Sequence, residues 1–267
     1  MKTFKFALYR NIIAFIAIAN ILISCGGSDS DSDIIIDPLP AGSGLYVTTV
    51  FPLLPDAFAN FYKVNEITGE TVQQPAPDDG EDPAYCPSLS ALDSRTDGIV
   101  FGAGYNTAAI YEVDPRTTRC RRVATTPEIM RALAVRSDGH IFTVSDTNKL
   151  YEFDGNFVEL SATTIQCASG FTSCPITGID FDFGAVIQSL YVIDRSGVWG
   201  ALDSTATVLV SQSGVGLADD FDIYIDSTFT VRGFAGSEYR IFDNLGNLQS
   251  NINLLGGTLT ITGAVYR

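Results

Sequence analysis

Histidine is almost absent from this sequence, and its scarcity excludes several classes of catalytic site. The 267 residues contain one histidine, His140, which lies at a turn before a predicted strand. A single histidine is too few for a histidine-based zinc site and leaves only one candidate for the base of a Ser-His-Asp triad. The motifs G-x-S-x-G and H-E-x-x-H are also absent. We therefore expect a binding protein rather than an enzyme.

Basic residues are scarce as well. The chain has 16 Lys and Arg against 31 Asp and Glu, which gives a formal net charge of −15. Phosphate binding requires clustered Lys and Arg, so nucleic acid is not an expected partner. An acidic surface also disfavours docking on anionic lipid.

Helical periodicity is missing after residue 24. No ten-residue segment repeats its apolar positions every 3.6 residues, whereas short runs of Val, Ile, Phe, Tyr and Thr are separated by Gly, Asp and Asn. A hydrophobic content of 46%, with 24 Gly and 17 Phe, is typical of a well-packed domain. The sequence therefore predicts an all-β fold.

The first 24 residues have the pattern of an export signal. Lys2, Lys5 and Arg10 precede an apolar run over residues 12–23, with no acidic residue between them. A membrane-spanning helix needs about 20 mostly apolar residues, and this run is shorter. We interpret residues 1–24 as a signal peptide.

The end of this signal resembles the lipobox of bacterial lipoproteins. The resemblance is carried by Leu22-Ile23-Ser24-Cys25. It implies that Cys25 receives acyl chains, palmitate among them, and becomes the first residue of a membrane-anchored protein. Because Gly26 stands where an Asp would favour the inner membrane, the resemblance implies the outer membrane, facing the periplasm or the cell surface. Residues 25–43 would be an acidic, flexible tether; the alternative is a secreted protein with Cys25 in a disulfide.

Four copies of a strand pattern follow one another at intervals of ~40 to 45 residues, which is the period of a β-propeller blade. Each copy has a first strand, a tight turn, a second strand that begins apolar-aromatic, and a third strand that ends in Asp. The first strands are expected at 90–95, 131–136, 177–182 and 219–224, with anchor residues Leu92, Leu133, Ile179 and Phe221. The second strands would contain Val100-Phe101, Ile141-Phe142, Leu190-Tyr191 and Phe229-Thr230. The third strands would end at Asp114, Asp154, Asp203 and Asp243.

The two ends of the domain complete one another. A first strand at 262–267 lacks its partners, and strands at 44–49, 60–65 and 69–74 lack a first strand. Together they would form a composite blade that closes a five-bladed propeller of four-stranded blades over residues 44–267. The elements "DG-(x)-apolar-aromatic" and "LY-x-apolar-D" resemble those of NHL, YVTN and gluconolactonase-like propellers. A β-sandwich or an open meander is the alternative.

Long loops are expected on one face of the propeller and tight turns on the other. The long segments span 50–59, 75–87 and 167–174, and loops of this kind often carry function. Their candidate ligand-contacting residues are Phe51, Phe58, Asp78, Asp79, Glu81, Asp82 and Phe171. The aromatic residues are equally compatible with a lid over the channel. The acidic ones are compatible with a solvated loop or, as the one cofactor considered, with Ca²⁺.

Residues at the mouth of the central channel form a second candidate set. Gluconolactonase-like propellers hold a divalent ion in the channel with acidic and amide side chains. The channel-mouth candidates here are Arg131, Thr177, Asp219, Asp220 and Thr262, which do not match that family's ligands residue by residue. For Asp219 and Asp220 we favour the alternative of polar groups solvated in a water-filled channel. We favour a non-catalytic binding or scaffolding module for an envelope protein, peptide or glycan. The alternative is a metal-dependent hydrolase or lactonase.

Cysteine parity agrees with lipidation of Cys25. Of the five cysteines, the other four form an even set that suits an oxidising compartment. Cys167 and Cys174 are expected to form a local disulfide, which leaves Cys86 and Cys120 as the second pair. The other two connectivities remain open.

Overall fold

The computed structural model of the chain comprises two units, Met1–Asp33 and Ile34–Arg267. The structure describes residues 36–50, 58–75, 85–166, 175–182, 188–195, 198–202, 212–213, 221–225, 230–243, 247–254 and 260–267. The predicted signal peptide and Cys25 lie outside these residues. Within the described ranges, no helix has the length and apolar character needed to cross a membrane.

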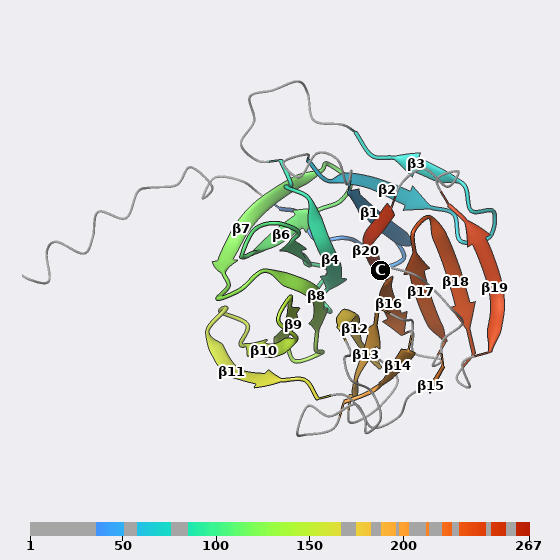
Figure 1. Cartoon of the computed structure of the whole chain (residues 1–267). Helices are drawn as coiled ribbons and strands as arrows, with labels where there is room; N and C mark the ends of the chain where they lie inside the picture. Colours follow the sequence, from blue (N-terminus) through green and yellow to red (C-terminus); the bar gives the residue numbers. More distant parts are fainter. Residues whose placement is uncertain are drawn as a thin grey trace, which may run out of the picture. The chain divides into compact units, whose positions relative to one another are not determined.

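The second unit is a β-propeller of five four-stranded antiparallel sheets around a central axis (Figure 1). Blade 1 contains β20 (Thr260–Tyr266), β1 (Leu45–Val50), β2 (Asn60–Val64) and β3 (Thr71–Gln73). Blade 2 contains β4 (Leu89–Ser94), β5 (Val100–Gly104), β6 (Ala109–Asp114) and β7 (Arg119–Thr125). Blade 3 contains β8 (Met130–Val135), β9 (Ile141–Ser145), β10 (Lys149–Phe153) and β11 (Glu159–Thr164). Blade 4 contains β12 (Ile176–Phe181), β13 (Leu190–Asp194), β14 (Val198–Ala201) and β15 (Gln212–Ser213). Blade 5 contains β16 (Phe221–Ile225), β17 (Val231–Ala235), β18 (Glu238–Phe242) and β19 (Leu248–Asn253). Each blade is given from its innermost strand outward, so β20, β4, β8, β12 and β16 surround the axis.

Hydrophobic clusters join the blades, one at each of the five interfaces. Between blades 1 and 2, for example, Tyr46 and Phe61 pack in one cluster with Leu92 and Val113. Strand residues alternate between the two faces of a sheet, so each blade contributes one set of apolar side chains to each neighbour. The core is therefore a ring of interfaces rather than one central mass.

The chain closes the ring by pairing its last strand with its first. On β20, Ala264 pairs with Val47 of β1 and Tyr266 pairs with Leu45. This arrangement leaves no open sheet edge next to the axis. The predicted fold class, a five-bladed propeller closed by its C-terminal strand, is confirmed.

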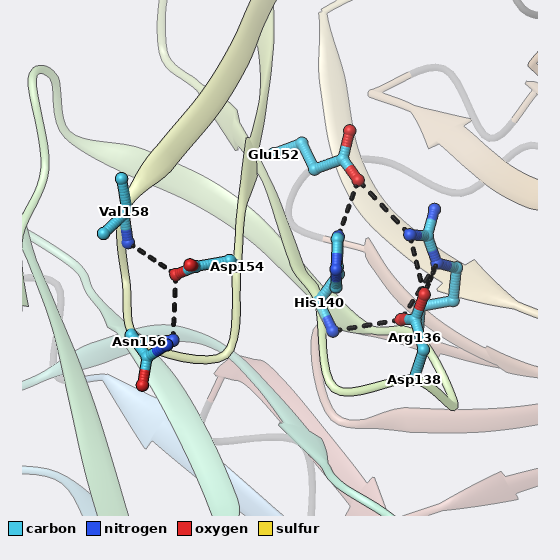
Figure 2. Close-up of polar contacts among 7 residues, drawn as sticks. All are labelled: Arg136, Asp138, His140, Glu152, Asp154, Asn156 and Val158. Carbon is cyan, nitrogen blue, oxygen red and sulfur yellow. Dashed lines mark hydrogen bonds and ion pairs between the residues drawn. The ribbon is translucent and has the colours of Figure 1, made fainter.

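Arg-x-Asp-Gly turns connect the first two strands of blades 2 and 3. In the first of them, Asp97 accepts a backbone hydrogen bond from Ile99 at 3.2 Å and forms an ion pair with Arg95. Gly98 adopts a φ of 93°, which favours glycine. The same arrangement recurs around Asp138 in blade 3 (Figure 2). These sequence motifs thus form the tight turns that the sequence predicts.

An aspartate at the end of a third strand closes the next turn in three blades. In blade 3, Asp154 Oδ1 accepts hydrogen bonds from the backbone amides of Asn156 and Val158 at 2.9 and 2.8 Å (Figure 2). Asp114 and Asp243 also accept backbone hydrogen bonds in their own turns. Asp203, predicted for this role in blade 4, lies outside the described residues.

Blade 5 differs from the sequence prediction by two residues. Ile223 pairs with Gly233 as Leu92 pairs with Gly102, so Ile223 and not Phe221 is the equivalent of the anchor residue. The second strand accordingly begins at Val231, after the predicted Phe229-Thr230. Because strand side chains alternate with a period of two, a shift of two residues preserves the apolar pattern. The apolar pattern alone therefore does not determine whether Phe221 or Ile223 is the anchor residue.

The packed unit also begins earlier than predicted. Residues 36–43 fall within the predicted tether, yet the Leu39 side chain is only 1% exposed. Its backbone amide donates to Gly98 O at 2.7 Å, and Arg116 Nη2 donates to Asp37 O at 3.2 Å. This segment is therefore part of the propeller, held against blade 2.

Candidate functional site

Four of the inner strands carry a β-bulge at the same position. On β4, Leu89 pairs with Gly104 and Ala91 with Ala103, so Ser90 is the extra residue. The registers of β8, β12 and β20 skip a residue at the equivalent place. The extra residues are Ser90, Arg131, Thr177 and Thr262. Bulges change the direction of a side chain and are common beside functional sites.

The four bulge residues meet at the mouth of the channel. Together with Tyr105 they line a cavity of about 30 Å³, large enough for a water molecule. A pocket of about 310 Å³ shares Tyr105, Arg131 and Thr177 with this cavity. It extends over blades 3 and 4 to Asp146, Asn148 and Arg195. We call the two together the mouth pocket.

The mouth pocket lies on the face that sequence analysis selects for binding. Asp146 and Asn148 lie between β9 and β10, and Arg195 follows β13. These are connections between second and third strands, which lie on the same face as the connections between blades. Tyr105 follows β5 and therefore lies on this face as well.

The guanidinium of Arg131 contacts Tyr105. Its Nη1 lies 3.4 Å from Tyr105 O, and its guanidinium carbon lies 5.4 Å from the centre of the Tyr105 ring. No carboxylate of the described residues forms an ion pair with it. Six other arginines do pair with a carboxylate: Arg95, Arg116, Arg121, Arg136, Arg232 and Arg240. The mouth pocket therefore contains a half-buried cation without a described counter-ion.

The three bulge hydroxyls differ in their hydrogen bonding. Ser90 donates to Met130 O at 2.7 Å, and Thr262 donates to Leu89 O at 2.6 Å, in each case on the next inner strand. Thr177 Oγ1 is buried but has no hydrogen-bond partner among the described residues. Buried hydroxyls are normally satisfied, so this donor is available to a ligand or water.

Buried aspartates lie further along the inner strands. Burial raises the pKa of Asp93 to about 7, against the opposing effect of two backbone hydrogen bonds. Burial also raises the pKa values of Asp180 and Asp222 well above the ordinary range, and repulsion from Asp93 adds to both shifts. Within the described part of the chain, no three His, Cys, Asp or Glu side chains are arranged to hold a metal ion.

The single histidine lies at the opposite end of blade 3 from the mouth pocket. His140 follows the β8–β9 turn, and its Nδ1 lies 2.8 Å from Glu152 Oε1 (Figure 2). Arg136 contacts the same carboxylate oxygen at 3.3 Å. His140 therefore belongs to a surface cluster on the tight-turn face and cannot act on a ligand at the mouth.

Four of the candidate residues in the sequence prediction are described: Phe58, Arg131, Thr177 and Thr262. Arg131 lies in the mouth pocket. Phe58 is 54% exposed, stacks edge-on against Tyr85 at 5.6 Å, and is not among the residues that line the pocket. The others lie outside the described residues: Phe51, Asp78, Asp79, Glu81, Asp82, Phe171, Asp219 and Asp220. The channel-mouth candidates Thr177 and Thr262 are both in place.

Sequence reasoning missed Ser90, Tyr105 and Arg195. Ser90 precedes the anchor Leu92 by two positions, as Arg131 precedes Leu133. An alignment of the repeats could therefore have identified Ser90 as a channel-mouth residue. Tyr105 and Arg195 lie at strand ends, where the repeat pattern carries no information on side-chain direction.

One disulfide is present among the described residues. It joins Cys86, just before β4, to Cys120 in the outer strand β7. Cys167 and Cys174 lie outside the described residues.

Comparison with known proteins supports the fold. No family model matches the sequence, and no curated protein is significantly similar to it. A chain of a nidogen–laminin complex is 9% identical, with a TM-score of 0.53 over 84% of this chain and 98% of that one. A Bacteroides caccae protein of unknown function is 10% identical, with a TM-score of 0.50 over 84% and 99%. A streptogramin B lyase is 17% identical, with a TM-score of 0.42, and the match covers 66% of this chain but only 57% of the lyase. At these identities the likeness concerns the propeller architecture alone.

Proposed function

We propose that this protein is a lipid-anchored lipoprotein of the outer membrane whose propeller binds a ligand at the mouth pocket without transforming it. The observation that carries the binding role is the convergence of four β-bulges on one channel mouth. A regular inner strand would need none of them, because a bulge interrupts the ladder of backbone hydrogen bonds. Their repetition at one place supports a site for a bound group.

The size and lining of the pocket also support binding. About 310 Å³ is within the usual range for small-molecule sites, at its lower end. Ile176 and Pro175 offer apolar surface beside the polar groups of Asn148 and Thr177. Such a mixed lining suits a ligand that is partly organic and partly polar.

Photocrosslinking in intact cells tests the binding role. A photoreactive residue at Asp146, beside the pocket, should capture a ligand or partner. The same residue at Asn156, in the β10–β11 turn on the opposite face, should not. Equal capture at both positions would contradict a site at the mouth. A purified protein that hydrolyses lactones or esters, and loses this activity on chelation of a bound ion, would instead support the hydrolase alternative.

The anchor rests on the resemblance of Leu22-Ile23-Ser24-Cys25 to a lipobox. Cells fed a clickable palmitate analogue should label the wild-type protein and a Ser28→Ala control, but not Cys25→Ala. Labelling of Cys25→Ala at the wild-type level would contradict lipidation at this residue. This experiment is independent of the pocket, so the two parts of the proposal can fail separately.

A further inference from the structure

We propose that the ligand of the mouth pocket carries a carboxylate, which is bound by the guanidinium of Arg131 and the hydroxyl of Thr177. This inference rests on the proposed binding function and names the chemical class of its ligand. The source of the carboxylate is either a small organic acid or the C-terminus of a peptide.

The first support is the lack of a described counter-ion for Arg131. The chain has almost twice as many acidic as basic residues, and six arginines of the described chain use carboxylate partners. Arg131 is half-buried, yet its polar contacts among the described residues are one long hydrogen bond to Tyr105 O and the ring of Tyr105. A partly desolvated cation without an anion costs free energy. Within the described residues nothing neutralises this charge, and a bound anion would do so.

The second support is the number of unused hydrogen-bond donors. A guanidinium has five N–H groups in a planar fork that matches the two oxygens of a carboxylate. The Tyr105 ring lies against Arg131 and restricts its orientation, so the fork is partly preorganised. Thr177 lines the same two cavities, and its buried Oγ1 has no hydrogen-bond partner among the described residues. Arginine and threonine can therefore donate to one carboxylate together.

The apolar lining of the pocket favours a carboxylate over a phosphate. Asp146 lies at the same pocket and the whole chain is strongly acidic. Arg195 lines the pocket together with Arg131, so the local charge attracts either anion, and the lining decides between them. The apolar surface of Pro175 and Ile176 suits the carbon body that accompanies a carboxylate.

Paired probes test the inference on the purified propeller. The probes are benzoate, N-acetyl-Gly-Phe with a free C-terminus, the amide of each, and inorganic phosphate; calorimetry or NMR titration measures the affinity. At least one carboxylate should bind at least 10-fold more tightly than its amide and more tightly than phosphate. Preference for benzoate indicates a small acid, and preference for the peptide indicates a C-terminus. Equal affinity for acid and amide, or tighter phosphate binding, would overturn the inference.

Arg131→Gln should weaken carboxylate binding at least 10-fold. Arg122→Gln is the matched control, because Arg122 is an exposed arginine of the outer strand β7 that contacts Thr125 and no described carboxylate. It removes the same charge from the protein and should leave the affinity unchanged. An equal loss of affinity in both variants would show that the effect comes from the net charge of the protein. That result would overturn the assignment of the carboxylate to Arg131.

Thermal unfolding separates a binding role of Arg131 from a structural one. Arg131→Gln should leave the melting temperature unchanged or raise it, whereas Arg136→Gln should lower it by breaking contacts with Asp138 and Glu152. A fall in the melting temperature of Arg131→Gln as large as that of Arg136→Gln would assign Arg131 a structural role.

The outcomes also distinguish the carboxylate proposal from the proposed binding function. Crosslinking at Asp146 that survives Arg131→Gln would keep the binding function and reject the carboxylate. A carboxylate that the protein binds and then converts would support the ligand class and reject the non-catalytic function.

Discussion

Asp93 of β4 accepts a hydrogen bond from the backbone amide of Val135 of β8 at 2.6 Å, across the interface between blades 2 and 3. Its other oxygen accepts from the amide of Ser94 at 2.6 Å. Asp180 and Asp222 repeat the arrangement: each accepts from the amide that follows it and from an amide of the next inner strand, Ile225 or Ala264. Three of the five blade interfaces are therefore joined by a buried carboxyl group.

These aspartates predict that the protein becomes less stable as the pH rises. The pKa of Asp93 is about 7 in the folded protein, above its ordinary value of 3.8, and those of Asp180 and Asp222 are raised in the same direction. Between these values the folded state holds protons that the unfolded chain releases, so the free energy of unfolding falls with increasing pH. The contribution is fully present below about pH 4 and is lost as the pH rises through about 7. Each group contributes at most about 1.4 kcal/mol per pH unit.

Denaturant unfolding of Asp93→Asn between pH 5 and 8 checks the assignment. An amide does not titrate, so the pH dependence should become shallower even though the variant loses one acceptor and is less stable overall. Glu159→Gln on the exposed outer strand β11 removes a carboxylate that is not buried and should keep the wild-type slope. Identical slopes in all three proteins would show that Asp93 is already ionised across this range.

Sequence patterns predicted the architecture because a propeller repeats its local chemistry. The Arg-x-Asp-Gly turns recur in blades 2 and 3, and the aspartates after the third strands recur in blades 2, 3 and 5. Two boundaries were wrong for physical reasons. Alternation with a period of two cannot distinguish Phe221 from Ile223, and the burial of Leu39 depends on a carbonyl of Gly98 that is distant in sequence.

The candidate site was only partly predictable. Arg131, Thr177 and Thr262 follow from their place two positions before an anchor residue, which puts them at one end of the inner strands. The bulges at these residues arise from the pairing of strands, and their positions cannot be recognised in a single sequence. The lack of an acidic partner for Arg131 among the described residues also depends on which side chains the closed ring brings near it.

The disulfide between Cys86 and Cys120 should contribute measurably to stability. It joins the segment before β4 to the outer strand of the same blade, with a sequence separation of 34 residues. A loop of this size predicts a loss of about 3 to 4 kcal/mol in the free energy of unfolding when both cysteines become serine, by the chain-entropy estimate. Reduction of the wild type should lower the free energy of unfolding by a similar amount. The variant lacks this disulfide, so reduction should change its stability little. An unchanged free energy in Cys86→Ser with Cys120→Ser would mean that the blade is held by packing alone.

Closure of the ring depends on a close approach between Gly263 of β20 and the backbone of β4. A Cβ atom at Gly263 would lie 2.8 Å from the carbonyl carbon of Ala91 and 2.9 Å from the amide nitrogen of Leu92. Backbone atoms cannot move aside as a flexible side chain can, so Gly263→Ala should separate blades 1 and 2 at the axis. We expect a loss of about 1–3 kcal/mol, seen as a lower melting temperature.

Gly155→Ala is the matched control for this prediction. A Cβ atom there would lie 3.7 Å from Gly139 O, which is ordinary contact, so the melting temperature should hardly change. Deletion of residues 260–267 is the stronger test, because it removes β20 and exposes the edge of β1 between Leu45 and Val50. The unpaired strand next to the axis should make this truncated protein aggregate or unfold. If the truncation and Gly263→Ala both melted like the wild type, the C-terminal strand would not be what closes the propeller.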